Sequence, residues 1–144
     1  IGQLDSAEVY ISKAINVYTQ LGTKAFGWGL PLSYLYLANL YFKNGEAAEQ
    51  RKEELIAQSH FKEALAYYLK SQKLYREQHS KSVGDIGDVN IGITYYKLNN
   101  IALADSFLTS GSKYLQKINF NGANANLDLT MQALIKLEQL NDGK

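Results

Sequence analysis

Apolar side chains recur every three or four residues along most of this chain, which is the period of an amphipathic helix. The first stripe runs from Leu4 to Leu21 and is followed by Gly22, a residue type that commonly ends helices. Further stripes predict helices over residues 31–44, 61–75, 86–98, 101–115 and 127–140. No segment alternates apolar and polar residues over the length of a strand. The pattern therefore predicts an all-α protein of about six helices.

Residues that favour helix ends stand at the borders of these stripes. Pro31 suits the first turn of a helix, where its missing N–H has no intrahelical partner. Asn44-Gly45 and Asn99-Asn100 each predict the end of a helix, and Asn100 is suited to cap the helix that follows. Amphipathic helices joined by short turns bury their apolar sides against each other, so we expect antiparallel helical hairpins.

A short pattern of apolar and small residues occurs three times, around Ala7, Ala64 and Ala104. An apolar residue precedes each alanine by three positions, another follows it by four, and a small residue follows it by seven. Recurrence at a spacing of tens of residues is typical of helical repeats. We expect these alanines, like Ala38 and Gly92 in mid-helix, to face a closely packed neighbouring helix. The three copies read Leu4, Ala7, Ile11, Ala14; Phe61, Ala64, Tyr68, Ser71; and Ile101, Ala104, Leu108, Gly111.

These motifs resemble the tetratricopeptide repeat. Its first-helix motif is similar to Leu37-Ala38 with Tyr41 and to Ile91-Gly92 with Tyr95, and its second-helix motif is similar to the alanine pattern. The step from Ala64 to Ala104 is 40 residues, longer than the basic repeat, and is similar to the long-period type of bacterial regulators and sensor kinases. The resemblance implies a right-handed superhelix, a solenoid, with residues 1–144 as one domain. We expect it to be a fragment of a longer array.

The resemblance also implies where a ligand would lie, because first helices line the concave groove of such arrays. Asn39 and Asn90 would contact a peptide backbone, since an amide offers both a donor and an acceptor. The family's clamp for a terminal carboxylate is not expected, because Leu35, Asp128 and Gln132 stand where cations belong. The groove positions are Leu35, Asn39, Phe42 and Lys43 on one helix, Val89, Asn90, Ile93, Tyr96 and Lys97 on the next, and Asp128, Gln132 and Ile135 on the last.

Residues 43–59 exceed the length that a 40-residue period allows. The segment is rich in helix formers, and Glu49/Lys52 and Arg51/Glu54 are opposite charges at helical neighbour spacing. We expect extra helix that lengthens the start of the following helix. Two other readings stay open: a mobile charged loop, and a projecting element that meets a partner.

Composition narrows the classes of function. The chain has 144 residues, a net charge of +1 and no cysteine, which excludes disulfides and cysteine-bound zinc and argues against a nucleic-acid binder. No apolar run approaches the roughly 20 residues that span a bilayer, so we expect a soluble segment, cytoplasmic or periplasmic. His60, placed at a helix start, and His79 are too isolated for a metal site, and Gly27-Trp28-Gly29 lacks the spacing of a phosphate loop.

No catalytic constellation is present in the sequence, so we expect no enzyme activity, no cofactor and no metal. The expected function is a peptide- or protein-binding scaffold, such as the sensing region of a bacterial signalling protein. The alternative is a structural or oligomerisation module without a regulated ligand. The expected partner is a protein or peptide segment or another domain of the same chain, with no nucleic acid and no direct membrane contact. Self-association through exposed array ends is also expected.

Overall fold

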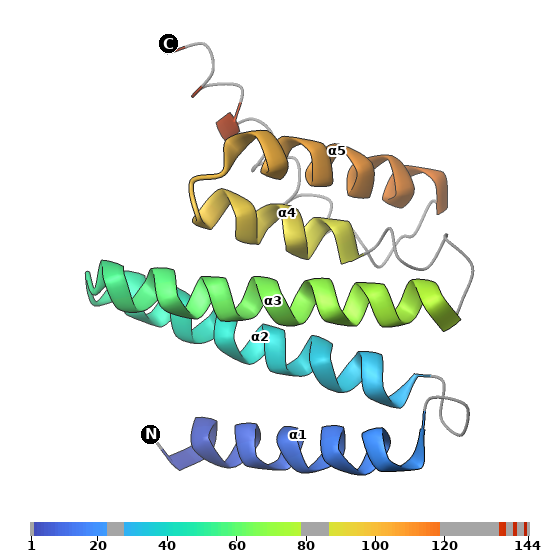
Figure 1. Ribbon diagram of the computed structural model, residues 1–144. Coiled ribbons are helices and arrows are strands. Elements are labelled where there is room, and N and C mark those ends of the chain that lie inside the picture. Colours follow the sequence, from blue (N-terminus) through green and yellow to red (C-terminus); the bar gives the residue numbers. More distant parts are fainter. Residues whose placement is uncertain are drawn as a thin grey trace. The chain divides into compact units, whose positions relative to one another are not determined.

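The computed structural model describes residues 2–22, 28–78 and 87–118, together with 136–137, 140 and 143. All regular secondary structure in these ranges is helical, as the sequence predicts, and forms five helices (Figure 1). The chain divides into two compact units, Ile1–Ser80 and Lys81–Lys144, and each is described by itself. That the two form one repeat domain stays a prediction.

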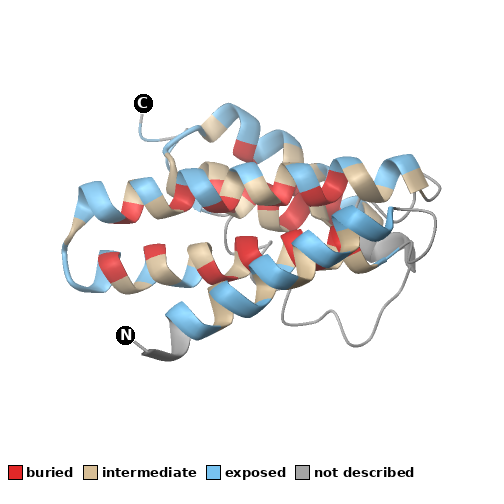
Figure 2. Ribbon diagram, turned by 60° about the horizontal axis from the view of Figure 1, so that its bottom comes forward, coloured by how far each residue is buried: buried red, intermediate tan, exposed pale blue. Residues whose placement is uncertain are grey.

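The first unit contains α1 (Gly2–Leu21), α2 (Gly29–Gln50) and α3 (Glu54–Gln78). Gly22 ends α1 with a φ of +76°, and Pro31 lies in the first turn of α2, both as predicted. Helix α2 packs against both of its neighbours, and Leu37, Phe61 and Ala64 lie in the core. Helix α1, which starts at the label N in Figure 2, has only intermediate and exposed side chains among its described residues. Ala7 is accordingly only half-buried.

The second unit contains α4 (Gly87–Lys97) and α5 (Ile101–Ile118). Ala104, Leu108 and Leu137 form its buried cluster. The predicted N-cap is confirmed, because Asn100 Oδ1 accepts a hydrogen bond from the Leu103 N–H at 3.3 Å. The predicted helix over 127–140 lies outside the described residues except for 136, 137 and 140, which are helical.

The first hairpin turns where the sequence does not predict it. The helix end predicted at Asn44-Gly45 is wrong, because α2 continues to Gln50. Gly45 is buried, and a Cβ atom there would lie 2.6 Å from Cε1 of Phe61. The glycine therefore allows the Phe61 ring to pack against the backbone of α2 and does not reverse the chain.

The reversal occurs at Arg51–Glu53, in a Schellman motif. Lys52 adopts a left-handed conformation with φ +61°. Its N–H donates to the Glu49 carbonyl, and the Glu53 N–H donates to the Ala48 carbonyl, both at 2.9 Å. These two bonds satisfy carbonyls that the end of α2 would otherwise leave unpaired.

The second hairpin uses the same turn. Asn99 has φ +59°, its N–H donates to the Tyr96 carbonyl at 3.0 Å, and the Asn100 N–H donates to the Tyr95 carbonyl at 2.9 Å. Each bond spans the same number of residues as in the first hairpin. The two turns therefore define matched positions along the chain.

Matched positions in the two hairpins are 47 residues apart, as Lys52 and Asn99 are. The 40-residue step is therefore wrong for this pair of hairpins, since the residue matched to Ala104 is Ala57 and not Ala64. Both alanines are buried, at most 1% exposed. Gly92 is matched to Gly45, and a Cβ atom there would lie 2.7 Å from Cγ of Leu108. Close approach at Gly92 is thus confirmed.

Residues 43–59 form the turn end of this hairpin. The predicted extension of the following helix is confirmed over residues 54–59, but residues 43–50 belong to the end of α2. A charged loop over the whole segment is wrong. Because the turn intervenes, Arg51 pairs with Glu53 at 2.9 Å and not with Glu54.

Candidate functional site

One side of α2 carries side chains that are exposed or half-buried. We call these residues the α2 surface, and their spacing of three or four positions places them on one side of the helix. Trp28 and Tyr36 are 49% and 57% exposed, which is high for aromatic side chains in a helical pair. The α2 surface comprises Trp28, Leu32, Leu35, Tyr36, Asn39 and Lys43.

A buried tyrosine hydroxyl holds the side chain of Asn39, the central polar residue of the α2 surface, by a hydrogen bond. Tyr68 of α3 is 6% exposed, and its hydroxyl donates to Asn39 Oδ1 at 2.6 Å. Burial, and next the charge of Glu46, raises the pKa of Tyr68 well above its ordinary value, so the hydroxyl keeps its proton. With Oδ1 engaged, the remaining hydrogen-bonding group of the Asn39 side chain is the Nδ2 donor.

Trp28 makes an edge-to-face contact with Tyr75 of α3. Its ring centroid lies 5.1 Å from that of Tyr75, with the planes at 77°. Burial raises the pKa of the Tyr75 hydroxyl. Trp28 is therefore only partly packed against α3, since half of its side chain stays exposed.

The predicted groove residues on α2 have different environments. Lys43 is exposed, whereas Leu35 and Asn39 are half-buried. Phe42 is turned toward the core, with its ring centroid 5.3 Å from that of Phe61. Asn39 and Lys43 therefore supply the polar groups of this side.

The predicted groove residues on α4 are mostly packing residues. Val89 is 3% exposed and lies against Gly111, so its predicted place in a groove is wrong. Ile93 and Tyr96 pack against the buried cluster of the second unit. The Asn90 side chain and Lys97 are half-buried, and the Asn90 carbonyl accepts a hydrogen bond from Thr94 Oγ1 at 2.7 Å.

Asn39 and Asn90 are not equivalent positions. Asn39 precedes the turn residue Lys52 by 13 positions, whereas Asn90 precedes Asn99 by nine. The three positions predicted on the last helix, Asp128, Gln132 and Ile135, lie outside the described residues.

The opposite side of the first hairpin carries a stack of rings that the sequence analysis missed. We call Tyr34, Tyr41, His60 and Tyr67 the tyrosine row. Tyr67 stacks between the two tyrosines of α2, with centroids 6.0 Å from Tyr34 and 5.6 Å from Tyr41. His60 follows at 6.0 Å from Tyr41, half-buried and in the second turn of α3, so its predicted place at a helix start is wrong. Spacings of seven, from Tyr34 to Tyr41 and from His60 to Tyr67, could have indicated the row.

A carboxylate of α1 joins the tyrosine row. The Tyr41 hydroxyl donates to Glu8 Oε1 at 2.7 Å, which links α1 to α2. Burial, the hydrogen bond to Glu8 and the charges of Glu8 and Glu63 raise the pKa of Tyr41 well above its ordinary value. Burial and the charges of Glu63 and Glu8 raise the pKa of Tyr67, against a smaller opposing effect of the Lys70 charge. Phenols that hold their protons this firmly suit hydrogen bonding and packing better than proton transfer near neutral pH.

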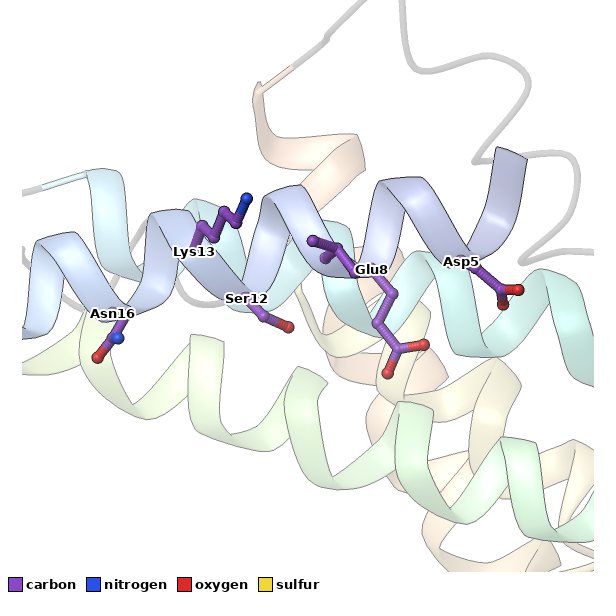
Figure 3. Close-up of a pocket in the computed structure, with 6 residues that line it drawn as sticks. Asp5, Glu8, Ser12, Lys13 and Asn16 are labelled. Atoms are coloured by element: carbon purple, nitrogen blue, oxygen red, sulfur yellow. The ribbon is translucent and has the colours of Figure 1, made fainter. Parts of the chain in front are cut away.

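A shallow hollow of about 490 Å³ runs beside Glu8 on α1. Within the part of the chain that the structure describes, only α1 lines it. Figure 3 shows Asp5, Glu8, Ser12 and Asn16 projecting to one side of the helix and Lys13 to the other. Val9 completes the lining.

No group of three or more His, Cys, Asp or Glu side chains in the described ranges could hold a metal ion. None of the helices described is both long and apolar enough to cross a membrane. No protein family model, no curated protein and no solved structure matches this chain.

Proposed function

We propose that this chain is a non-enzymatic helical-repeat scaffold of the tetratricopeptide type that binds a peptide or a segment of another protein. Two features of the hairpins support the repeat. In each, a glycine of the first helix lies against a large apolar residue of the second, and the same turn joins the helices. The second-helix motif recurs as Ala57, Phe61 and Ala64 and, 47 residues on, as Ala104, Leu108 and Gly111.

The α2 surface is the proposed binding site. The observation that carries this proposal is the combination of exposed Trp28 and Tyr36 with the fixed amide of Asn39. Tryptophan and tyrosine are enriched at binding interfaces, because they supply large contact areas at a small entropic cost. A bound segment would pack apolar side chains on these rings and accept a hydrogen bond from Asn39 Nδ2 through a main-chain carbonyl. In a bacterial regulator, such binding would alter the superhelix and signal to an attached domain.

The test is selection from a displayed random-peptide library, followed by affinity measurement for a selected peptide. Tyr36→Ala and Asn39→Ala should each weaken binding at least tenfold, because the side chains of the proposed site are lost. Leu55→Ala is the matched control, since Leu55 is an apolar residue, 87% exposed, at the turn end of the hairpin. Binding that Tyr36→Ala and Asn39→Ala leave unchanged would overturn the proposed site.

A structural or oligomerisation module is the second candidate, and α1 favours it. Val9, Tyr10, Val17 and Leu21 are each at least half exposed, which is a large apolar surface for one helix. Light scattering after size exclusion distinguishes the candidates. A dimer that Val17→Lys dissociates would support this second function, whereas a monomer at all concentrations would contradict it.

A further inference from the structure

Helix α1 is packed less tightly against α2 than α3 is. From Asp5 onward none of the described side chains of α1 is buried, whereas Leu37 of α2 and Phe61 and Ala64 of α3 are at most 4% exposed. A helix in a protein is stabilised mainly by the apolar surface that it buries, so α1 gains the least from packing among the three helices of this unit. Segments with few buried contacts open at a lower free energy than the whole fold.

Two contacts show how α1 lies along α2. Near the end of α1, the Tyr18 ring lies against Gly29, where a Cβ atom would overlap it. Near the start of α1, the Tyr41 hydroxyl donates to Glu8 Oε1 at 2.7 Å. The two helices are therefore antiparallel, and α1 covers the side of α2 that extends from Gly29 to Tyr41.

The covered side of α2 is buried and partly apolar. Three residues that follow Gly29 at helical spacings of three or four share its side of the helix. We call them the covered strip; they are Ser33, Leu37 and Leu40, and each is at most 9% exposed. Removal of α1 would expose this strip to water, while the contacts of α2 with Phe61 and other residues of α3 would remain.

We propose that α1 is a lid that opens from α2 as one unit while the hairpin of α2 and α3 stays folded, with the Glu8–Tyr41 hydrogen bond as its latch. The closed lid keeps the covered strip from solvent, and the open lid exposes it. This device goes beyond peptide binding and does not depend on it, because no residue of the covered strip belongs to the α2 surface.

Single cysteines can report the opening, because the chain has none of its own. Ser33→Cys places a thiol under α1, and Ser71→Cys is the matched control on α3, where Ser71 is 3% exposed and donates to the Pro31 carbonyl. Urea denaturation gives the rate of thiol labelling that global unfolding allows in each variant. We expect Ser71→Cys to react at that rate and Ser33→Cys at least tenfold faster. Reaction of Ser33→Cys only at the global rate would overturn the proposal.

Amide hydrogen exchange of the unsubstituted chain tests whether α1 moves as a unit. The amides of Ile11, Ala14 and Ile15 should share one opening constant, with the same dependence on low concentrations of urea. This constant should be at least tenfold larger than that of the Phe61 and Ala64 amides on α3. Equal opening constants for the two helices would also overturn the proposal.

Loss of one hydroxyl tests the latch. Tyr41→Phe should raise the opening constant of α1 by about fivefold or more, because only the closed state contains the bond to Glu8. Tyr67→Phe is the control, since it removes the same group from a ring of α3 for which no hydrogen bond to a described residue of α1 is present. An equal rise in both variants would reject the latch.

A core substitution separates the lid from the hairpin. Phe61 packs against Gly45 of α2 whether α1 is closed or open. Phe61→Leu should therefore raise the global unfolding constant, read from the α3 amides, and leave the opening constant of α1 unchanged. A parallel rise of the two constants would show that α1 opens only with the whole unit, which would overturn the proposal.

Discussion

The hairpin of α2 and α3 and the hairpin of α4 and α5 agree near their turns and differ away from them. Both reverse through a Schellman motif and both place a glycine against a large apolar residue. Away from the turn, α4 begins at Gly87, which is matched to Leu40, whereas α2 begins at Gly29. The residues near the turn therefore determine the register of the two helices. The additional length of α2 carries Tyr34, Tyr36 and Asn39, on which the tyrosine row and the α2 surface depend.

Removal of the large apolar residue opposite each glycine should have the largest effect. Phe61 and Leu108 are both fully buried. Phe61→Ala should lower the free energy of unfolding by about 3–5 kcal/mol and Leu108→Ala by about 2–5 kcal/mol, because each leaves a cavity. Urea denaturation followed by circular dichroism measures both. Losses below 1 kcal/mol would show that these positions are not matched core sites.

The two glycines should respond differently to a methyl group. A Cβ atom at Gly92 would lie 2.9 Å from the backbone nitrogen of Leu108, whereas at Gly45 the nearest atoms belong to the side chain of Phe61, which adjusts at lower cost than backbone. Gly92→Ala should therefore cost about 2–3 kcal/mol and Gly45→Ala about 1 kcal/mol, after the better helix propensity of alanine is included. Thermal unfolding of both variants tests which substitution costs more. A Gly92→Ala variant more stable than Gly45→Ala would contradict the prediction.

Alkaline pH should destabilise the protein through the first hairpin. Tyr68 is buried there, and its matched position in the second hairpin is Leu115. Because the folded protein raises the pKa of Tyr68 above its ordinary value of 10.0, the unfolded state loses the proton first, and stability falls as the pH rises above about 10. The slope approaches about 1.4 kcal/mol per pH unit for each such tyrosine. In Tyr68→Phe, the free energy of unfolding should fall less steeply between pH 10 and 12. A slope equal to that of the unsubstituted protein would contradict this.

The turn residues should show the smallest effect. Lys52 and Asn99 both have positive φ, but asparagine adopts this conformation more readily than lysine. Lys52→Gly should therefore stabilise the protein by about 0.5–1 kcal/mol, and Asn99→Gly by less. Chemical denaturation of the pair resolves the difference. Destabilisation by Lys52→Gly would show that the left-handed conformation is absent.

The sequence predicts the helical class and several helix ends correctly, because periodicity, Gly22 and Asn100 act locally. The turn of the first hairpin could not be predicted in this way. Asn44-Gly45 has the composition of a turn, whereas Lys52 does not. The packing of Phe61 against Gly45, a contact between two helices, favours the longer helix and cannot be read from the local sequence. The tyrosine row was missed for a similar reason, since its rings come from two helices whose register depends on that turn.

The register of the two hairpins is the central claim, and nuclear Overhauser contacts test it most directly. The account predicts contacts from the Phe61 ring to the Gly45 α-protons and from the Leu108 methyl groups to the Gly92 α-protons. Absence of the Phe61–Gly45 contact, with a helix end at Asn44 instead, would contradict the shared 47-residue plan.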